Sequence, residues 1–323
     1  MNENAGHSEP KSRWMTLLAF AIIYFVWGST FLAIRIGVSE VPPLLFAAMR
    51  FVVAGLVLFG WMIARGERWP TTRQWRSLAL LALLIFVIDY GLLFWAEQRV
   101  PSGIAAIMMA TIPVFMAISE VAILRTQRLT VRLILALLVG IAGVAVLMSR
   151  GLHLGGAPVD SVGAVALIVG AMSWSIASAL SRKLPLPASK ATSSGAQMLV
   201  GGLLLTVAAA AFGEFRNFHP FEVSLEAWLA LLFLIVFGSI IGFTAYVWLI
   251  HHESPTKVGT YAYVNPVVAV ILGYFLGGEA LALRTIVGVV FVLISVVSIT
   301  TTRVKKLNTT ESKVDGARLA ESE

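Results

Sequence analysis

Two ionisable residues lie inside long apolar runs of this sequence. Arg50 falls in the run 42–64 and Asp89 in the run 74–96. At a helical rise of about 1.5 Å per residue, each would lie roughly 12 Å from the nearer end of its helix. An ionisable side chain in a membrane helix faces a partner or a wet cavity. We therefore expect Arg50 and Asp89 to face a common cavity and to interact directly or through water. A purely structural ion pair between the two helices is the alternative.

Aromatic and amide side chains occur at similar depths in other apolar runs. Trp and Tyr often anchor helices at membrane interfaces, but Trp27 and Trp174 lie deeper than an anchor requires. Together such groups could hold an amphipathic solute by apolar, cation–π and hydrogen-bond contacts. The expected substrate-binding residues are Trp27, Thr30, Arg50, Asp89, Tyr90, Met108, Trp174, Gln197, Tyr261, Tyr263 and Asn265.

Two prolines interrupt apolar runs at corresponding places in the two halves of the chain, Pro113 and Pro266. A proline leaves a backbone carbonyl unpaired and kinks a helix. In membranes, broken helices are tolerated where they line a cavity. We expect Pro113 and Pro266 to mark hinges beside a binding region; packing kinks without ligand contact are the alternative.

Several kinds of chemistry are missing from the sequence. There is no Cys, which excludes disulfides and thiolate metal sites. No H-E-x-x-H, P-loop, dinucleotide or G-x-S-x-G motif occurs. We therefore expect no enzyme activity, no cofactor and no bound metal, and an ion gradient as the energy source, with a coupling proton as one option.

The elements that must position these residues are membrane helices. The chain is 58% hydrophobic and only 13% charged, whereas soluble domains carry roughly a quarter charged residues. Runs of about twenty apolar residues are long enough to cross a bilayer. We expect an all-α membrane protein with ten transmembrane helices at 14–36, 42–64, 74–96, 102–124, 130–149, 160–182, 190–212, 225–250, 255–276 and 281–302.

Basic residues between the runs indicate orientation. Most of the 24 Lys and Arg residues lie in the terminal segments and in alternate connections. The positive-inside rule then places both termini in the cytoplasm. Since the bases do not form one patch, the net charge of +7 does not indicate nucleic-acid binding.

The second half of the chain repeats the first. Trp27 precedes Arg35 by eight residues, as Trp174 precedes Arg182. A shift of about 147 residues also aligns 52–58 with 199–205. Five helices per repeat make the copies inverted, an architecture typical of secondary transporters. The expected units are a cytoplasmic leader 1–13, a first repeat 14–149, a periplasmic connection 150–159, a second repeat 160–302 and a disordered cytoplasmic tail 303–323.

A set of short motifs resembles a known family. These include Trp27-Gly28-Ser29-Thr30-Phe31, Pro101-Ser102-Gly103-Ile104-Ala105-Ala106 and Ala262-Tyr263-Val264-Asn265-Pro266. They are similar to the ten-helix EamA branch of the drug/metabolite transporter (DMT) superfamily, over about Trp14 to Thr302. The resemblance implies a bacterial inner-membrane permease with a cavity lined by helices 1–4 and 6–9. Relatives often carry Gly-Glu at the fifth helix of each repeat; here the first repeat has Thr126-Gln127 instead.

These observations favour one function over three others. We expect a secondary transporter that exports a small metabolite, an amino acid or a derivative, by alternating access. A broad drug-efflux permease, a passive channel and a membrane-embedded lipid-modifying enzyme are the alternatives.

Overall fold

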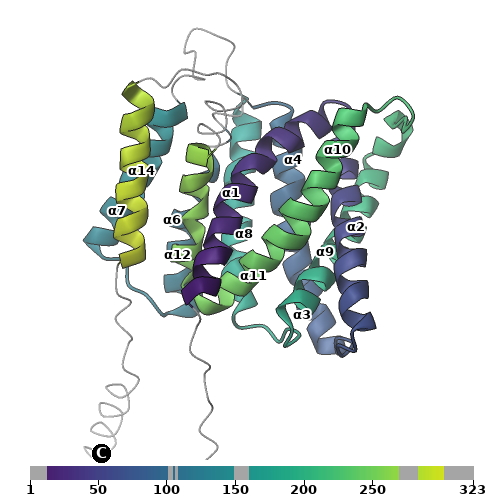
Figure 1. Cartoon of the computed structure of the whole chain (residues 1–323), viewed down its shortest axis with the longest axis horizontal. Helices are drawn as coiled ribbons and strands as arrows, with labels where there is room; N and C mark the ends of the chain where they lie inside the picture. The colour runs from purple at the N-terminus through teal and green to yellow at the C-terminus, as the bar shows by residue number, and fades with distance from the viewer. Residues whose placement is uncertain (1–12, 101–104, 106–107, 149–159, 269–282, 302–323) are drawn as a thin grey trace, which may run out of the picture.

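The regular structure of this protein is helical throughout the residues that the structure describes (Figure 1). The structure, a computed structural model, describes residues 13–100, 105, 108–148, 160–268 and 283–301. Its helices are α1 (Arg13–Val38), α2 (Pro43–Ala64), α3 (Thr72–Ala82), η1 (Leu83–Tyr90), α4 (Gly91–Glu97), α6 (Ile112–Ser119), η2 (Glu120–Leu124), α7 (Val131–Met148), α8 (Ser161–Ser181), α9 (Lys190–Ala211), η3 (Glu214–Asn217), α10 (Leu225–Phe233), η4 (Leu234–Ile241), α11 (Gly242–His252), α12 (Pro255–Gly259) and α14 (Leu283–Thr301).

The expected membrane spans are present. Six continuous helices are long and apolar enough to cross a bilayer, among them Thr72–Glu97 and Leu225–His252. Three shorter apolar helices and the helical residues 255–268 account for the other spans. The all-α prediction with ten helices is thus confirmed. The predicted connection 150–159 and tail 303–323, and the leader apart from Arg13, lie outside the described residues.

Polar side chains fix where several helices begin. Thr71 and Gln74 form a reciprocal capping box at α3, and Asp160 accepts hydrogen bonds from two backbone amides at the start of α8. Ser189 and Ser224 cap α9 and α10 in the same way. Each cap satisfies amides that have no partner inside the helix. These residues therefore set the helix boundaries that the apolar pattern only approximates.

Helices α2 and α9 cross closely because glycines remove side chains from the crossing. A Cβ on Gly55 would lie 2.3 Å from the Leu199 nitrogen, and a Cβ on Gly202 would lie 2.5 Å from the Val52 nitrogen. The shift of about 147 residues that aligns the repeats places Gly55 on Gly202 and Val52 on Leu199, so each contact is the repeat equivalent of the other. Reciprocal contacts of this kind define a two-fold interface. The crossing therefore lies where the inverted repeats meet.

A second reciprocal crossing joins α7 and α14, which lie side by side at one edge of the bundle (Figure 1). A Cβ on Gly143 would lie 2.8 Å from the Val292 nitrogen, and one on Gly288 would lie 2.9 Å from the Leu147 nitrogen. The residues of this pair form a core cluster separate from that of the main bundle. The fifth helix of each repeat is therefore peripheral, as the resemblance implied.

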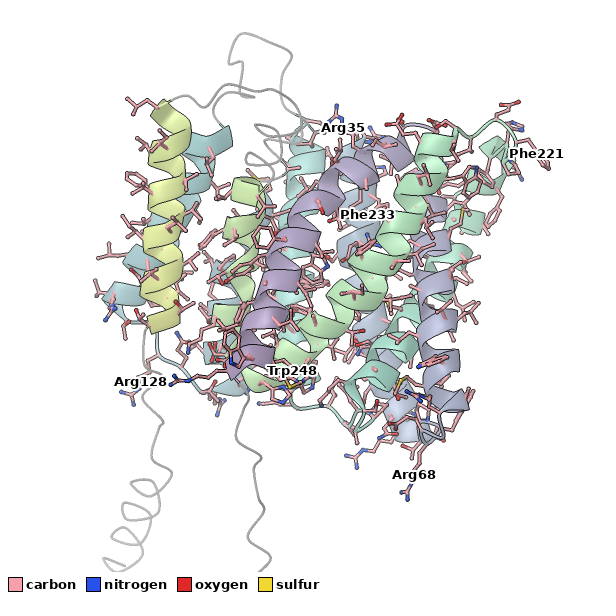
Figure 2. The ribbon with its side chains drawn as sticks, in the orientation of Figure 1. Arg35, Arg68, Arg128, Phe221, Phe233 and Trp248 are labelled. Carbon is pink, nitrogen blue, oxygen red and sulfur yellow. The ribbon has the colours of Figure 1, made fainter. Side chains whose placement is uncertain are left out.

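The bundle has two distinct ends (Figure 2). Arg68 and Arg128 lie at one end, and Arg35 and Phe221 at the other; we call these the Arg68 end and the Phe221 end. Carboxylates join the two repeats at the Phe221 end: Glu40 accepts hydrogen bonds at 2.7 Å from the Ser224 amide and from the Ser224 hydroxyl. These bonds lower the pKa of Glu40.

The matching contact at the Arg68 end uses Glu120. This residue is 1% exposed and accepts hydrogen bonds from the Thr256 amide and, at 2.7 Å, from the Thr256 hydroxyl. Helix α12 begins one residue earlier, so Glu120 also places negative charge at a helix N-terminus, which is favourable. Both ends of the bundle are thus held across the repeat boundary.

Candidate functional site

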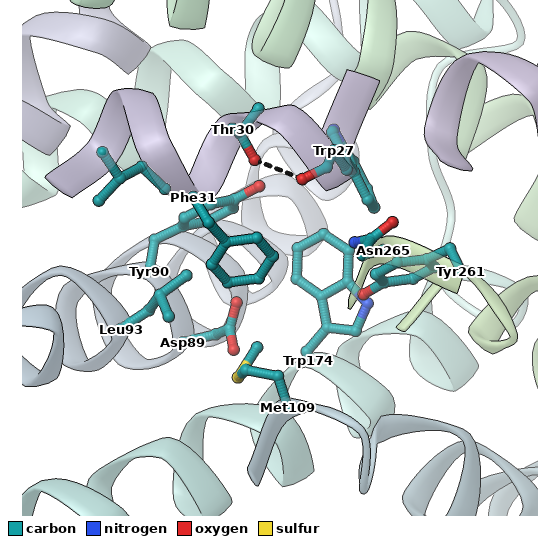
Figure 3. A pocket seen from close by; sticks show the side chains of 11 residues that line it. Trp27, Thr30, Phe31, Asp89, Tyr90, Leu93, Met109, Trp174, Tyr261 and Asn265 are labelled. Atoms are coloured by element: carbon teal, nitrogen blue, oxygen red, sulfur yellow. Dashed lines mark hydrogen bonds between the residues drawn. The ribbon is translucent and has the colours of Figure 1, made fainter. Parts of the chain in front are cut away.

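The candidate site is a small cavity between the two repeats (Figure 3). The first repeat contributes residues from α1, η1, α4 and the helical residues 108–109, and the second contributes α8 and the helical residues 261–268. Its volume is about 50 Å³. Its lining is formed by Trp27, Thr30, Phe31, Ile34, Asp89, Tyr90, Leu93, Met109, Trp174, Tyr261 and Asn265.

Aromatic rings from both repeats form one wall of this cavity. The Trp27 ring centroid lies 5.6 Å from that of Trp174 and 4.8 Å from that of Tyr261, both in edge-to-face geometry. Tyr246 completes the group, with centroids 5.2 Å from Trp27 and 4.7 Å from Trp174. Packed rings of this kind hold one another rigidly and present both apolar faces and polar edges. The two tryptophans at equivalent positions of the repeats therefore lie in contact.

Asp89 supplies the ionisable group of the cavity. The residue is 3% exposed and its Oδ1 has no hydrogen-bond partner within the part of the chain that the structure describes. It packs against Gly170 of α8, where an added Cβ would lie 3.1 Å from Oδ1. Figure 3 shows Asp89 facing the cavity opposite Trp174 and Tyr261. A buried acceptor without a partner is costly, so this carboxyl group is available to a ligand.

Arg50 lies behind the cavity wall. Its Nε donates a hydrogen bond of 2.8 Å to Ser239 Oγ, and its guanidinium carbon lies 4.7 Å from the Phe51 ring centroid and 5.2 Å from that of Tyr90. Its Nη1 has no partner among the described atoms. Arg50 and Asp89 form no ion pair, so the expected direct interaction between them is wrong. The Arg50 guanidinium contacts Ser239 and the rings of Phe51 and Tyr90 instead. Tyr90 lines the cavity and Arg50 does not, so the tyrosine lies between the guanidinium and the cavity.

Two π-helical segments occupy corresponding positions in the third helix of each repeat. Segment η1 carries Asp89 and Tyr90 into the cavity wall, and η4 carries Gly238 and Ser239. Interruptions of this type are frequent at functional sites. A side chain from the first helix of the opposite repeat donates to a carbonyl in each segment: Trp27 Nε1 to Gly238 O at 3.0 Å, and Ser173 Oγ to Leu84 O at 2.8 Å.

Glycines make the contact at η4 possible. A Cβ on Gly238 would lie 2.8 Å from Arg50 Nη2, and one on Gly242 would lie 2.6 Å from Trp27 Nε1. The absence of these side chains lets Trp27 reach the π-helical backbone. The Gly238–Gly242 spacing therefore serves close helix contact, as small-residue spacings in membranes do.

The prolines lie beside breaks, though not at them. The fourth helix turns at residues 110–111, and Pro113 falls in the first turn of α6. The ninth helix is interrupted at Thr260, six residues before Pro266. The Thr260 hydroxyl donates to Lys257 O at 2.6 Å and lies 2.7 Å from Tyr24 Oη. The two broken helices touch, since a Cβ on Gly259 would lie 3.3 Å from the Pro113 Cα. Whether either proline acts as a hinge stays a prediction.

Asn265 is well placed in the cavity and also joins two helices. With its amide nitrogen turned toward two carbonyls, it donates to Tyr261 O at 3.0 Å and to Tyr24 O at 3.3 Å. This orientation follows from the hydrogen-bonding pattern. Asn265 therefore ties the ninth helix to α1 beside the aromatic wall.

Besides Arg50, three expected binding residues do not line the cavity. Tyr263 is fully buried against the α7–α14 pair and its hydroxyl donates to Leu137 O at 2.9 Å. Gln197 donates to Ser193 Oγ at 3.0 Å and does not line the cavity. Met109 lines the cavity and its neighbour Met108 does not.

The structure also identifies residues that the sequence analysis missed. Phe31 lies in the cavity, Tyr246 lies between the two tryptophans, and Ser239 binds Arg50. Tyr246 could have been identified from the sequence, because it is a polar aromatic residue deep in an apolar run and Tyr261 was selected on that same ground. Within the described ranges there is no cluster of three or more His, Cys, Asp or Glu residues that could hold a metal ion.

Together, the inverted five-helix repeats and the aromatic cavity between them, which contains one carboxyl group, have the arrangement of a membrane transporter. The chain matches the EamA-like transporter family over residues 14–149 and 161–301, one match per repeat. It therefore belongs to the EamA-like family of the DMT superfamily, and it is not an enzyme.

Relatives agree with this membership. The chain is 39% identical over 266 residues to YedA of Escherichia coli K12, described as an uncharacterized inner membrane transporter, covering 82% of this chain and 83% of YedA. It is 25% identical to the Bacillus subtilis transporter YvbV, over 90% of this chain and 93% of YvbV. A protein crystal structure of 20% identity has the same fold, with a TM-score of 0.72 over 90% of this chain and 98% of that one.

Proposed function

We propose that this protein is a secondary transporter that exports a small metabolite carrying an amino group, an amino acid or a derivative. Asp89 carries the proposal, because it combines an ionisable carboxyl group, burial and an unpartnered oxygen in a cavity between the repeats. A substrate ammonium group would satisfy that oxygen by a charge-assisted hydrogen bond. The adjacent tryptophan faces add cation–π attraction.

The same cavity offers a donor for the opposite end of the substrate. Trp174 Nε1 is buried without a hydrogen-bond partner among the described residues. Indole N–H is a donor only, and a substrate carboxylate would satisfy it. An acceptor and a donor that both lack partners suit a zwitterion better than an apolar solute.

The size of the cavity supports alternating access. A volume of about 50 Å³ holds a few water molecules, whereas ligand pockets measure roughly 300–1,000 Å³. Substrate binding therefore requires the repeats to move apart. In the proposed cycle, one repeat rocks against the other about the α2–α9 crossing, and the bends at η1 and η4 open the cavity to one side at a time.

The Arg68 end is cytoplasmic in this proposal. The support is the clustering of basic residues in the connections at that end, which the positive-inside rule assigns to the cytoplasm. Both termini then lie on the cytoplasmic side of a bacterial inner membrane. A proton that Asp89 binds in alternation with the substrate would supply the energy for export.

Counterflow in proteoliposomes tests the proposal. Vesicles are preloaded with one unlabelled amino acid at a time, and transient accumulation of the labelled compound is followed. We expect accumulation for one class of amino acid, reduced at least about tenfold in Asp89→Asn, since hydrogen bonds to charged groups contribute about 1.5–3 kcal/mol. The matched control is Asp160→Asn, which retains a capping side chain at the start of α8.

Two outcomes would contradict the proposal. Full counterflow by a folded Asp89→Asn variant would remove Asp89 from the site. Accumulation of lipophilic cations alone, with no amino acid carried, would favour broad drug efflux, for which the aromatic wall is the supporting observation. In that case Tyr246→Leu would reduce transport more than Asp89→Asn.

A further inference from the structure

A second hollow, far larger than the site cavity, opens sideways from the bundle. It has a volume of about 740 Å³ and lies between α2, the η1–α4 segment, α8 and α9. Val165 and Phe212 on its walls are 62% and 79% exposed. Its lining residues belong to the halves of these helices near the Phe221 end. We call it the lateral groove.

The position of the lateral groove decides what surrounds it. Its walls are parts of helices that are long and apolar enough to span a bilayer. Except at its end, its lining is apolar, with residues such as Val169, Ala208 and Leu92. A groove of this kind at bilayer depth faces acyl chains, and an apolar chain lying in it would lose no hydrogen bonds.

The rim of the groove carries both signs of charge. Glu214 is the one charged residue in the lining. It accepts backbone hydrogen bonds from Leu45 at 2.7 Å and from Leu44 at 3.3 Å. A carboxylate has about four lone-pair positions, so two remain for a ligand. Partial burial raises the pKa of Glu214, and the two backbone hydrogen bonds oppose that rise.

The positive charge comes from the opposite wall. Trp95 lines the groove, and the Arg99 guanidinium carbon lies 4.4 Å from the centroid of its ring. The Arg99 Cβ lies 3.7 Å from where a Cβ on Gly163 would be, beside the groove residue Val162. Arg99 is therefore held at the mouth of the groove by Trp95, and the N–H groups at the edge of its guanidinium plane are suited to bind phosphate.

We propose that the lateral groove binds one phospholipid with a primary-amine headgroup, phosphatidylethanolamine, from the leaflet at the Phe221 end. An acyl chain lies along the valine-lined wall, the phosphate binds Arg99, and the ammonium group donates to Glu214. A primary ammonium has three hydrogens to donate, whereas a choline headgroup has none. The proposal depends on the chain spanning a bilayer and not on which solute it carries. In the orientation proposed above, this leaflet is the outer one.

Native mass spectrometry of the full-length protein, relipidated with defined phospholipids, tests this inference. We expect one phosphatidylethanolamine retained per chain, with phosphatidylcholine and phosphatidylglycerol each retained about tenfold less, a ratio typical of one charged hydrogen bond. Glu214→Gln should remove the preference for phosphatidylethanolamine over phosphatidylcholine. Arg99→Gln should weaken retention of both lipids.

A pair of neighbouring substitutions provides the control. Ala208 lines the groove and Val207 is 68% exposed on the same helix outside it. Ala208→Phe should abolish retention, and Val207→Phe should leave it unchanged. Equal effects of the two, or retention by Ala208→Phe, would overturn the proposal. So would a dimer that Ala208→Phe dissociates while lipid retention is unaltered, because a second copy would then fill the groove. Counterflow by Ala208→Phe is measured in a separate assay, so failure of the lipid-binding proposal is distinguishable from failure of the transport proposal.

Discussion

At the residue scale, access to the cavity and not burial distinguishes the proposed substrate-binding carboxylate from the buried arginine behind it. Asp89 and Arg50 are 3% and 1% exposed, yet only Asp89 lines the cavity. Arg50 has a designated partner in Ser239 and two flanking rings. Since Tyr90 lies between the guanidinium and the cavity, we infer that Arg50 positions Tyr90 and η4 and also contributes charge.

Ser239→Ala tests that positioning role. Removing the hydroxyl leaves a buried charged donor unpaired, which costs about 1–3 kcal/mol. We expect a lower thermal unfolding midpoint in detergent and slower counterflow at unchanged apparent affinity. Arg50→Lys should produce a similar loss, because lysine lacks the planar group that the rings and Ser239 hold.

Combining Ser239→Ala with Arg50→Lys tests whether the two residues act through their mutual contact. If the two residues act through one contact, Ser239→Ala adds little in an Arg50→Lys background. Additive losses of stability would mean that Arg50 is held by other groups. Unchanged stability in Ser239→Ala alone would contradict the contact itself.

At the element scale, the π-helical segments connect helix geometry with function. Each presents a backbone carbonyl to a side chain of the opposite repeat, Leu84 to Ser173 and Gly238 to Trp27. A carbonyl freed from the ordinary helical ladder can change partners when the repeats move, which a carbonyl inside a regular helix does less readily.

Ser173→Ala removes one of these contacts without adding volume. We expect slower counterflow with substrate affinity unchanged, since Ser173 does not line the cavity, and a stability loss of about 1 kcal/mol. Ser194→Ala is a matched control, because that hydroxyl bonds only within its own helix, to Lys190 O. An equal effect of the two variants on transport would count against a role for η1 in the conformational change.

The α2–α9 crossing yields a second prediction at this scale. Gly55→Ala places a Cβ 2.3 Å from the Leu199 nitrogen, so the helices must separate. We expect destabilisation of about 1–3 kcal/mol, the range for overpacked cores. Gly60→Ala in the same helix meets nothing within 4 Å and should be neutral or stabilising. Thermal unfolding of both variants in detergent provides the comparison, and equal stability would place the crossing elsewhere.

At the scale of the whole molecule, pseudo-symmetry decides the architecture. The reciprocal crossings α2–α9 and α7–α14 relate the halves, and Glu40, Glu214 and Glu120 tie them together at the two ends. Glu40 holds its charge to lower pH than usual, so its contact with Ser224 strengthens folding above the ordinary carboxyl pKa and is lost as the pH falls through the lowered value.

The proposed orientation follows from the whole molecule and is simple to test. The sequence contains no Cys, so a single introduced cysteine reacts with a thiol reagent without competing labelling from native thiols. Phe221→Cys should react with a membrane-impermeant maleimide added to intact cells, and Arg68→Cys should react only after permeabilisation. Phe221 is fully exposed, so burial could not explain a failure of Phe221→Cys to react with the maleimide. The opposite labelling pattern would invert the assignment.

The sequence by itself determined the elements and their duplication. Apolar run length and the Trp27–Arg35 and Trp174–Arg182 spacing identified ten helices in two repeats, because the bilayer requires about twenty apolar residues per span. Residue type and depth also selected seven of the cavity-lining residues: Trp27, Thr30, Asp89, Tyr90, Trp174, Tyr261 and Asn265.

Only the tertiary structure decided which way each side chain faces. Depth along a helix is readable from residue number, but the phase around the helix depends on breaks and π-helical turns that the sequence does not display. Tyr263, which follows the interruption at Thr260, turns to the α7–α14 pair. Met109 lines the cavity and Met108 does not, and Gln197 lies away from the cavity although α9 is unbroken, so packing also decides which face of a regular helix is turned inward. Glu97 shows the same limit: it lies at the end of α4 and is nevertheless only 4% exposed. The partners of Arg50 come from η1 and η4, and only packing of the two repeats brings those segments together.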